Sequence, residues 1–438
     1  YTLGGSIRFD GSDLFGVDKK YRYLPLYSVS GLWRISQEPF MASAKWIDNL
    51  VVRASYGLQG NIDKNTSPFL LGNYRIENIL PGGSEDMIDV SGAPNKKLRW
   101  EKTHSVNAGF DFAVLNQAIN LSVDYYYRKG VDLIGTQMLP LETGFEMLTV
   151  NWASMRNQGV EVALSTRNVH TKNFMWTTNF NFAYNNNKVL KEALREDALE
   201  PGREGYPAGA LFALKTAGLD EEGYPMFQDK DGKAVSAMEF FKLQEWGFGA
   251  TDLTARERRE LYTYVGTADC PYTGGFNNTF TYKAFELGVN FSFDFGGKVR
   301  SQPTYSIVDF DKGRNTNRDI LNRWTPENTE TIFPVLLSQN ERLDEYMWYS
   351  NQNEIYRNLD IWIRDLNYVR LQNIRLGYTL PTNFTRTLGM TSATVAIEGR
   401  NLLVFGSSYK NYLDPETMSN AYATPAPKSV TLSLNLIF

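Results

Sequence analysis

The chain ends on the stretch Ser429-Val-Thr-Leu-Ser-Leu-Asn-Leu-Ile-Phe438, in which apolar and polar residues alternate. Successive side chains of a β-strand point to opposite faces. One face of this strand therefore carries Leu432, Leu434, Leu436 and Phe438, and the other carries mostly small polar residues. In a soluble protein, such an exposed apolar edge would promote aggregation. The stretch favours a strand whose apolar face meets lipid.

The same alternation recurs along the chain and predicts about twelve strands. It is clearest over 118–128 and 285–295, where aromatic and aliphatic residues alternate with polar ones. Most segments have about the 9–11 residues that a tilted strand needs to cross a bilayer. The predicted fold is all-β, a transmembrane antiparallel β-barrel, with strands near 2–10, 26–36, 49–59, 103–114, 118–135, 158–168, 174–186, 275–283, 285–298, 366–379, 392–404 and 428–438.

One predicted strand, 366–379, breaks its own alternation. Val369 and Leu371 belong to one register, whereas Ile374 and Leu376 belong to the other. One extra residue in a strand shifts the phase in this way, so we expect a β-bulge near Asn373.

The connections between the predicted strands alternate between short and long. Bacterial barrels have short periplasmic turns and longer extracellular loops. The alternation therefore predicts long extracellular loops near 60–102, 187–274 and 299–365, and a periplasmic C-terminus. A soluble β-sandwich would also show alternating residues along its strands. It would not explain why short and long connections follow each other in strict alternation.

Composition excludes several classes of protein. Lys+Arg of 45 against Asp+Glu of 49 gives a net charge of −4, so no polybasic surface points to a nucleic acid. No apolar run is long enough for a transmembrane helix. With Cys270 as the only cysteine and two distant histidines, we expect no disulfide, metal site, cofactor or catalytic triad. The segment Asp229-Lys-Asp-Gly232 resembles part of a calcium loop, but two ligand positions are missing, so we expect a turn.

Short segments spread over the whole chain carry a resemblance to a known family. They include Arg8-Phe-Asp-Gly-Ser12, Ser30-Gly-Leu-Trp-Arg-Ile-Ser36, Arg156-Asn-Gln-Gly-Val-Glu161, Asn322-Arg-Trp-Thr-Pro-Glu-Asn328 and Glu398-Gly-Arg-Asn-Leu402. Together they resemble the SusC/RagA-type TonB-dependent outer-membrane transporters of the Bacteroidetes. The final strand, with Leu434, Leu436 and Phe438, likewise resembles the assembly signal of outer-membrane barrels.

The resemblance implies a 22-stranded barrel that holds a plug, of which this chain would be the C-terminal part. The plug and the first strands would then precede Tyr1, which is neither an initiator methionine nor part of a leader. The implied function is active import of a glycan oligosaccharide or a peptide, without covalent chemistry. The implied partners are a SusD-like lipoprotein, TonB acting through the plug, and outer-membrane lipid, in a dimer of transporter–lipoprotein pairs. A passive porin or structural barrel is the alternative, and a barrel enzyme is a third possibility.

Two groups of residues are candidates for function. Charged residues on the polar faces of the strands would line the lumen and contact the plug or the substrate: Arg8, Asp10, Arg34, Arg53, Asp124, Arg128, Glu161, Asp294, Glu398 and Arg400. Aromatic residues of the long loops would contact ligand or partner, or pack against one another. The second group comprises Trp246, Tyr262, Trp324, Tyr346, Trp348, Tyr349 and Tyr356.

Overall fold

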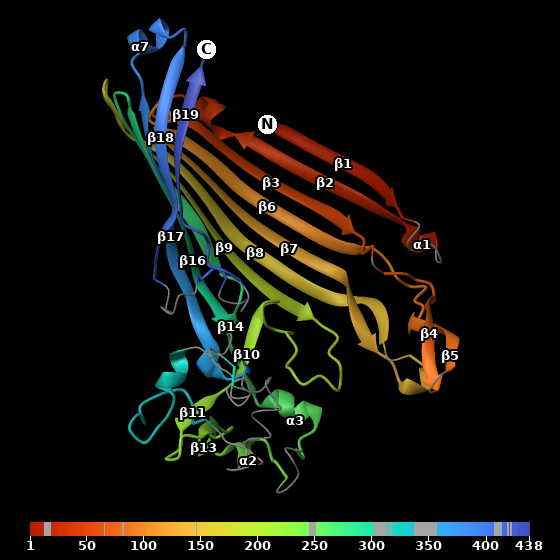
Figure 1. Cartoon of the computed structure of the whole chain (residues 1–438). Helices are drawn as coiled ribbons and strands as arrows, with labels where there is room; N and C mark the ends of the chain where they lie inside the picture. Colours follow the sequence, from red (N-terminus) through yellow and green to blue (C-terminus); the bar gives the residue numbers. More distant parts are fainter. Residues whose placement is uncertain are drawn as a thin grey trace.

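The computed structural model describes residues 1–12, 19–64, 66–80, 83–145, 147–244, 251–301, 313–314, 318–336, 357–406, 414–417, 420 and 423–438. Twelve strands form one antiparallel sheet in which each strand pairs with the next along the chain (Figure 1). They are β1 (Thr2–Gly11), β2 (Tyr23–Arg34), β3 (Ile47–Asn61), β6 (Glu101–Val114), β7 (Ile119–Met138), β8 (Met147–His170), β9 (Phe174–Lys191), β15 (Tyr272–Tyr282), β16 (Phe285–Arg300), β17 (Ile363–Thr379), β18 (Ser392–Phe405) and β19 (Ser429–Ile437).

All twelve predicted strands are present, but several are longer than predicted at the end that carries the loops. β8 begins at Met147, eleven residues before its predicted start at 158, and pairs there with the end of β7, which lies at Met138 instead of the predicted 135. Between Trp152 and Val160 every second residue is polar (Ser154, Arg156 and Gln158), and this interrupts the alternation by which a strand is recognised. Asn151 holds it in place by donating hydrogen bonds to the carbonyls of Arg99 and Asp132, both at 2.7 Å.

The predicted bulge lies in β17. Leu371 pairs with Leu403 and Asn373 pairs with Arg400, and Gln372 between them pairs with neither neighbouring strand. Because Gln372 is an extra residue, the strand changes parity at this point. Tyr368 and Arg370 before the bulge therefore lie on the same polar face as Arg375 after it.

The apolar face carries two rows of aromatic rings. Cross-strand pairing places Phe174, Tyr282, Phe285 and Tyr378 in one row, near the short turns. Ten residues further along the same strands, it places Tyr184, Tyr272 and Phe295 in a second row. Ten residues of strand, tilted as in a barrel, span roughly 25 Å of membrane, the height of the apolar band of a transmembrane barrel.

The two ends of the sheet differ (Figure 1). One end carries the C-terminus, the short turns and α7 (Thr382–Thr387), and the other carries the long connections. In these lie the hairpin of β4 (Leu71–Leu80) and β5 (Gly83–Gly92), strands β10 (Ala210–Leu214) and β14 (Tyr262–Thr267), the small sheet of β11 (Thr216–Leu219), β12 (Pro225–Gln228) and β13 (Ala234–Val235), and helices α1 (Lys19–Arg22), α2 (Ala237–Phe240) and α3 (Ala255–Glu260). Short 3-10 turns lie at Ile35–Gln37, Pro39–Met41, Leu141–Thr143, Arg318–Asn322 and Asp360–Trp362. Within the described ranges, no helix is long and apolar enough to cross a membrane.

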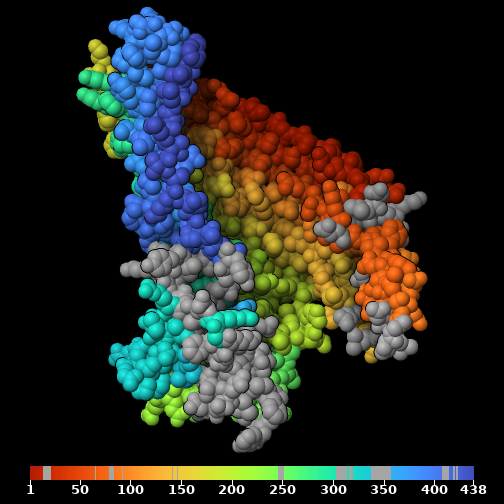
Figure 2. Space-filling model, in the orientation of Figure 1, coloured from red at the N-terminus to blue at the C-terminus, as the bar shows by residue number. Residues whose placement is uncertain are grey.

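The long connections at 187–274 and 299–365 share one hydrophobic core, here called the loop core. Its buried residues come from both connections and include Phe227, Phe240, Leu359 and Trp362. Three rings pack closely: Phe227 stacks on Phe240 with their centres 4.8 Å apart, and Phe241 meets Phe227 edge-on at 5.1 Å. The loop residues therefore gather into one body at the end of the sheet, visible below the blue strands in Figure 2.

Candidate functional site: the concave face of the sheet

The polar face of the sheet is its concave face. Residues from eight strands, from Asn49 in β3 to Gln372 in β17, line one hollow of about 670 Å³. A single sheet can line one hollow with eight strands only if it curves around it. The register puts the polar side chains of these strands on the same side. A curved sheet with a polar concave face and an apolar convex face is the wall of a barrel around a lumen.

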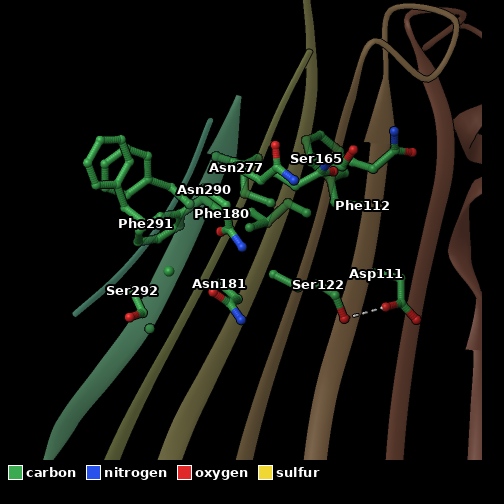
Figure 3. A pocket seen from close by; sticks show the side chains of 18 of the residues that line it. Asp111, Phe112, Ser122, Ser165, Phe180, Asn181, Asn277, Asn290, Phe291 and Ser292 are labelled. Atoms are coloured by element: carbon green, nitrogen blue, oxygen red, sulfur yellow. Dashed lines mark hydrogen bonds between the residues drawn. The ribbon is translucent and has the colours of Figure 1, made fainter. Parts of the chain in front are cut away.

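Small polar side chains form rows across this face. Asp111, Ser122, Asn181 and Ser292 lie in one row, as Figure 3 shows, because their strands pair in this register. The next row holds Asn120, Ser165, Asn179, Asn277 and Asn290. Asparagine and serine both donate and accept hydrogen bonds, so such rows suit contact with water, with backbone or with hydroxyl-rich ligands.

The strongest ionic cluster of predicted lumen residues is centred on Arg53. Its guanidinium pairs with Asp124 at 2.5 Å and with Asp111, and it donates to the Ser122 hydroxyl at 3.2 Å. Ser122 in turn donates to Asp111 at 2.7 Å. Three neighbouring strands, β3, β6 and β7, are thus joined on the lumen side by one arginine. Asp111 was not predicted, although it alternates with Phe110 and Phe112.

The register places the other predicted lumen residues on the same face. Arg8 pairs with Asp10 at 2.6 Å, and Arg400 pairs with Glu398 at 2.5 Å. Asp294 accepts a hydrogen bond of 2.5 Å from Tyr368. These polar contacts join residues of the sheet to one another. The predicted contacts of the same residues with plug or substrate stay predictions.

The remaining three lumen candidates have no ion pair among the described residues. Arg128 lies over the ring of Tyr126, 5.0 Å from its centre. Glu161 stands directly opposite Asp124, and Arg34 stands opposite Val51. Asp124 is paired with Arg53, so Glu161 is the carboxylate of this facing pair that has no cation within ion-pair distance among the described residues.

A buried ionic site on β17 was not among the predicted site residues. Arg370 is 1% exposed, pairs with Asp414 and pairs with Glu416 at 2.8 Å. Asp414 also accepts backbone hydrogen bonds from Glu416 at 3.0 Å and Ala426 at 3.1 Å. Burial alone would raise the pKa of Asp414, but these hydrogen bonds and the Arg370 guanidinium hold that pKa below its ordinary value. The described residues around Asp414 and Ala426, between β18 and β19, are thereby fixed to the wall.

The predicted aromatic contact residues fall into two groups. Tyr262 packs against the loop core and accepts a hydrogen bond of 3.2 Å from the Asn358 amide, and its burial raises the pKa of its hydroxyl. Trp324 lies directly over Gly223, where an added Cβ would come within 2.5 Å of the indole. The predicted contacts of Trp246, Tyr346, Trp348, Tyr349 and Tyr356 lie outside the described residues.

The Asp229–Gly232 segment is a tight turn between β12 and β13. The Asp229 carboxylate accepts from the amides of Asp231 at 3.0 Å and Lys233 at 2.7 Å, and Gly232 has a φ of +80°. These bonds use the carboxylate to close the turn. Across the described ranges, no group of three or more His, Cys, Asp or Glu residues is placed to hold a metal ion.

The amphipathic curved sheet defines the class of protein as part of the wall of an outer-membrane β-barrel. Residues 1–227 match the family model described as "TonB dependent receptor-like, beta-barrel", and the chain belongs to this family. Among curated relatives, the chain is 26% identical to TonB-dependent receptor P3 of Formosa agariphila over 100% of the chain and 44% of the relative. It is 25% identical to TonB-dependent receptor SusC of Bacteroides thetaiotaomicron over 100% of the chain and 42% of SusC.

A solved structure has the same fold. The structure described as "Structure of the RagAB peptide transporter" superposes with a TM-score of 0.77 at 24% identity, covering 99% of this chain and 45% of that chain. The chain therefore spans less than half the length of the relatives it matches. The comparisons confirm the family and the fold class that the sequence predicted.

Proposed function

We propose that this chain forms part of the barrel of a SusC-like importer, which takes up a nutrient across the outer membrane. The observation that carries the proposal is the concave face, which is lined with polar groups over eight strands opposite an apolar, aromatic-banded convex face. A packed core would be apolar on this side. A polar interior suits a lumen that holds a plug and passes a hydrophilic solute.

In this proposal the import is active, and the barrel performs no covalent chemistry. TonB supplies the energy by acting on a plug inside the barrel, and a SusD-like lipoprotein delivers the nutrient at the surface, in a dimer of transporter–lipoprotein pairs. The substrate class we favour is a glycan oligosaccharide, with a peptide second. The similarity to SusC supports the transport class, and the fold shared with a peptide transporter supports the second substrate.

The proposal also gives the barrel a direction in the membrane. The loop core and the long connections lie at one end of the sheet, and the short turns and the C-terminus lie at the other (Figure 1). In bacterial barrels the short turns are periplasmic. We therefore place the loop core outside the cell, where it meets the nutrient, and Phe438 on the periplasmic side.

Growth of a strain that lacks the gene tests the function. We expect the deletion to remove growth on one class of carbon source in a panel of neutral glycans, acidic glycans and peptides. Loss of TonB should remove the same growth, because the import needs energy. Growth that depends on this gene but not on TonB would overturn active import and favour the passive porin.

A further inference from the structure

Three arginines line a second pocket, which lies in the loops at the mouth of the barrel. The pocket, here called the Arg300 pocket, has a volume of about 380 Å³. Its arginines come from both long connections and from the end of β16: Arg203, Arg300 and Arg357. Among the described residues that line it, Glu200 is the only acidic one, so their formal charge is +2.

Arg300 is held in place by neutral groups. Its Nη1 donates to the carbonyl of Arg357 at 2.9 Å and to the side-chain oxygen of Asn358 at 2.5 Å, and its Nη2 donates to the carbonyl of Phe212. These bonds fix the plane of the guanidinium without neutralising its charge. No carboxylate of the described residues lies within ion-pair distance of Arg203, Arg300 or Arg357.

The fixed arginine has hydrogen-bonding capacity left over. A guanidinium carries five N–H groups, and the three acceptors above use three of them. The Nε–H and one Nη2–H have no acceptor among the described residues. Nε and Nη2 form one edge of the planar fork, and such an edge matches the two oxygens of a carboxylate.

The surroundings of this edge favour a carboxylate ligand over a neutral one. Arg203 and Arg357 are exposed and free to turn toward an anion in the pocket. Leu211, Phe212 and Tyr262 also line the pocket, so its lining includes apolar as well as charged residues. The Arg300 guanidinium is held in position, and two flexible guanidinium groups lie beside it. Such a site binds a planar anion at a low entropic cost.

We propose that the Arg300 pocket binds a carboxylate group of the imported nutrient. The inference rests on the proposed function, since it names the chemistry of the substrate of the same importer. The carboxylate belongs either to a uronic acid of an acidic oligosaccharide or to the free C-terminus of a peptide. A neutral glycan lacks the group, so the pocket would discriminate against it.

Binding to the whole protein, purified from outer membranes in detergent, tests the pocket apart from transport. Two pairs of probes are titrated by calorimetry. The first pair is trigalacturonate and the neutral maltotriose. The second pair is one tripeptide with a free C-terminus and the same tripeptide with an amidated C-terminus. We expect one acidic probe to bind about ten-fold or more tightly than its neutral counterpart, because a charge-assisted pair is gained. The pair that shows the preference identifies the source of the carboxylate.

Four variants locate the site. Arg203→Gln and Arg357→Gln change exposed residues and should each weaken the acidic probe several-fold, while Arg300→Gln should abolish the preference. Glu200→Gln removes the competing negative charge and should tighten binding.

The matched control is Arg195→Gln, an exposed arginine of the same connection that pairs with Asp197 and does not line the pocket. It should leave both affinities unchanged. Equal affinity for acidic and neutral probes, or no effect of Arg203→Gln and Arg357→Gln, would overturn the inference while leaving TonB-dependent import intact.

Discussion

Arg370 is the residue on which the connection between β18 and β19 depends. Replacing it with Gln would leave Asp414 buried without its cation, and breaking a buried ion pair costs about 3–5 kcal/mol. We expect Arg370→Gln to expose residues 414–427 to proteolysis without unfolding the sheet. Arg375→Gln is the matched control, because its pair with Glu286 is largely exposed. Equal cleavage of both variants would contradict the assignment.

The pH dependence of the same contact follows from Asp414. Its pKa is below the ordinary value in the folded protein, so the stability it contributes is present above the ordinary pKa and is lost as pH falls through the folded one. We expect the Ala426 amide, which donates to Asp414 at 3.1 Å, to stay protected from exchange at neutral pH and to lose protection below about pH 4. In Asp414→Asn, protection should be weak and independent of pH.

Single residues show how far the sequence could predict the site. Alternation alone assigned Arg53, Asp124 and Asp294 to the polar face, because the face of a residue follows from its parity along a strand. The partners of these residues depend on cross-strand register and on loops that fold back, which no local pattern records. The Arg370–Asp414 contact joins positions 44 residues apart and was therefore not predicted.

At the scale of a strand, β19 tests which face meets lipid. Leu434 pairs with Val395 on the apolar face and is 63% exposed in this chain, as a lipid-facing residue would be. We expect Leu434→Arg to reduce the folded, heat-modifiable fraction in the outer membrane, since arginine facing lipid costs about 2–4 kcal/mol near the midplane. Ser433→Arg, one residue away on the polar face, should assemble nearly as well as the wild type. Equal loss in both variants would contradict the assignment of faces.

The strands were predictable where one face meets lipid and the other does not. All twelve were found, and the phase break near Asn373 correctly indicated the bulge at Gln372. The loop-side ends of β7 and β8 were not found, because Ser154, Arg156 and Gln158 interrupt the apolar series of β8 and the register of the two strands shifts between Gly130 and Ile134. Helix α3 shows a local signal of another kind, because Thr254 and Glu257 form a capping box that specifies its start.

At the scale of the molecule, the loop core joins connections that are far apart in the sequence. Phe227 is completely buried at its centre, and such a Phe→Ala change costs about 3–5 kcal/mol. We expect Phe227→Ala to unfold the loop core, so that proteases cleave within 210–262 while the sheet stays heat-modifiable. Phe384→Ala, an exposed residue at the opposite end, is the control. A stable loop core in Phe227→Ala would show that the sheet alone orders the loops.

Cysteine labelling in intact outer membranes tests the central claim, that the polar face lines a lumen and the apolar face meets lipid. Burial and nearby Asp294 raise the pKa of native Cys270 to about 11, and a Cys270→Ser background removes its slow reaction. Single cysteines are placed at 120–123 of β7 and 431–434 of β19 and treated with a water-soluble maleimide or a lipid-soluble one.

We expect a strict period of two in the labelling. Cysteines at the positions of Asn120, Ser122, Thr431 and Ser433 should react with the water-soluble reagent, and those at Leu121, Val123, Leu432 and Leu434 only with the lipid-soluble one. Labelling without this alternation, or with the two faces exchanged, would contradict the assignment of the sheet as the wall of a barrel. It would also contradict the proposed importer, which depends on that assignment.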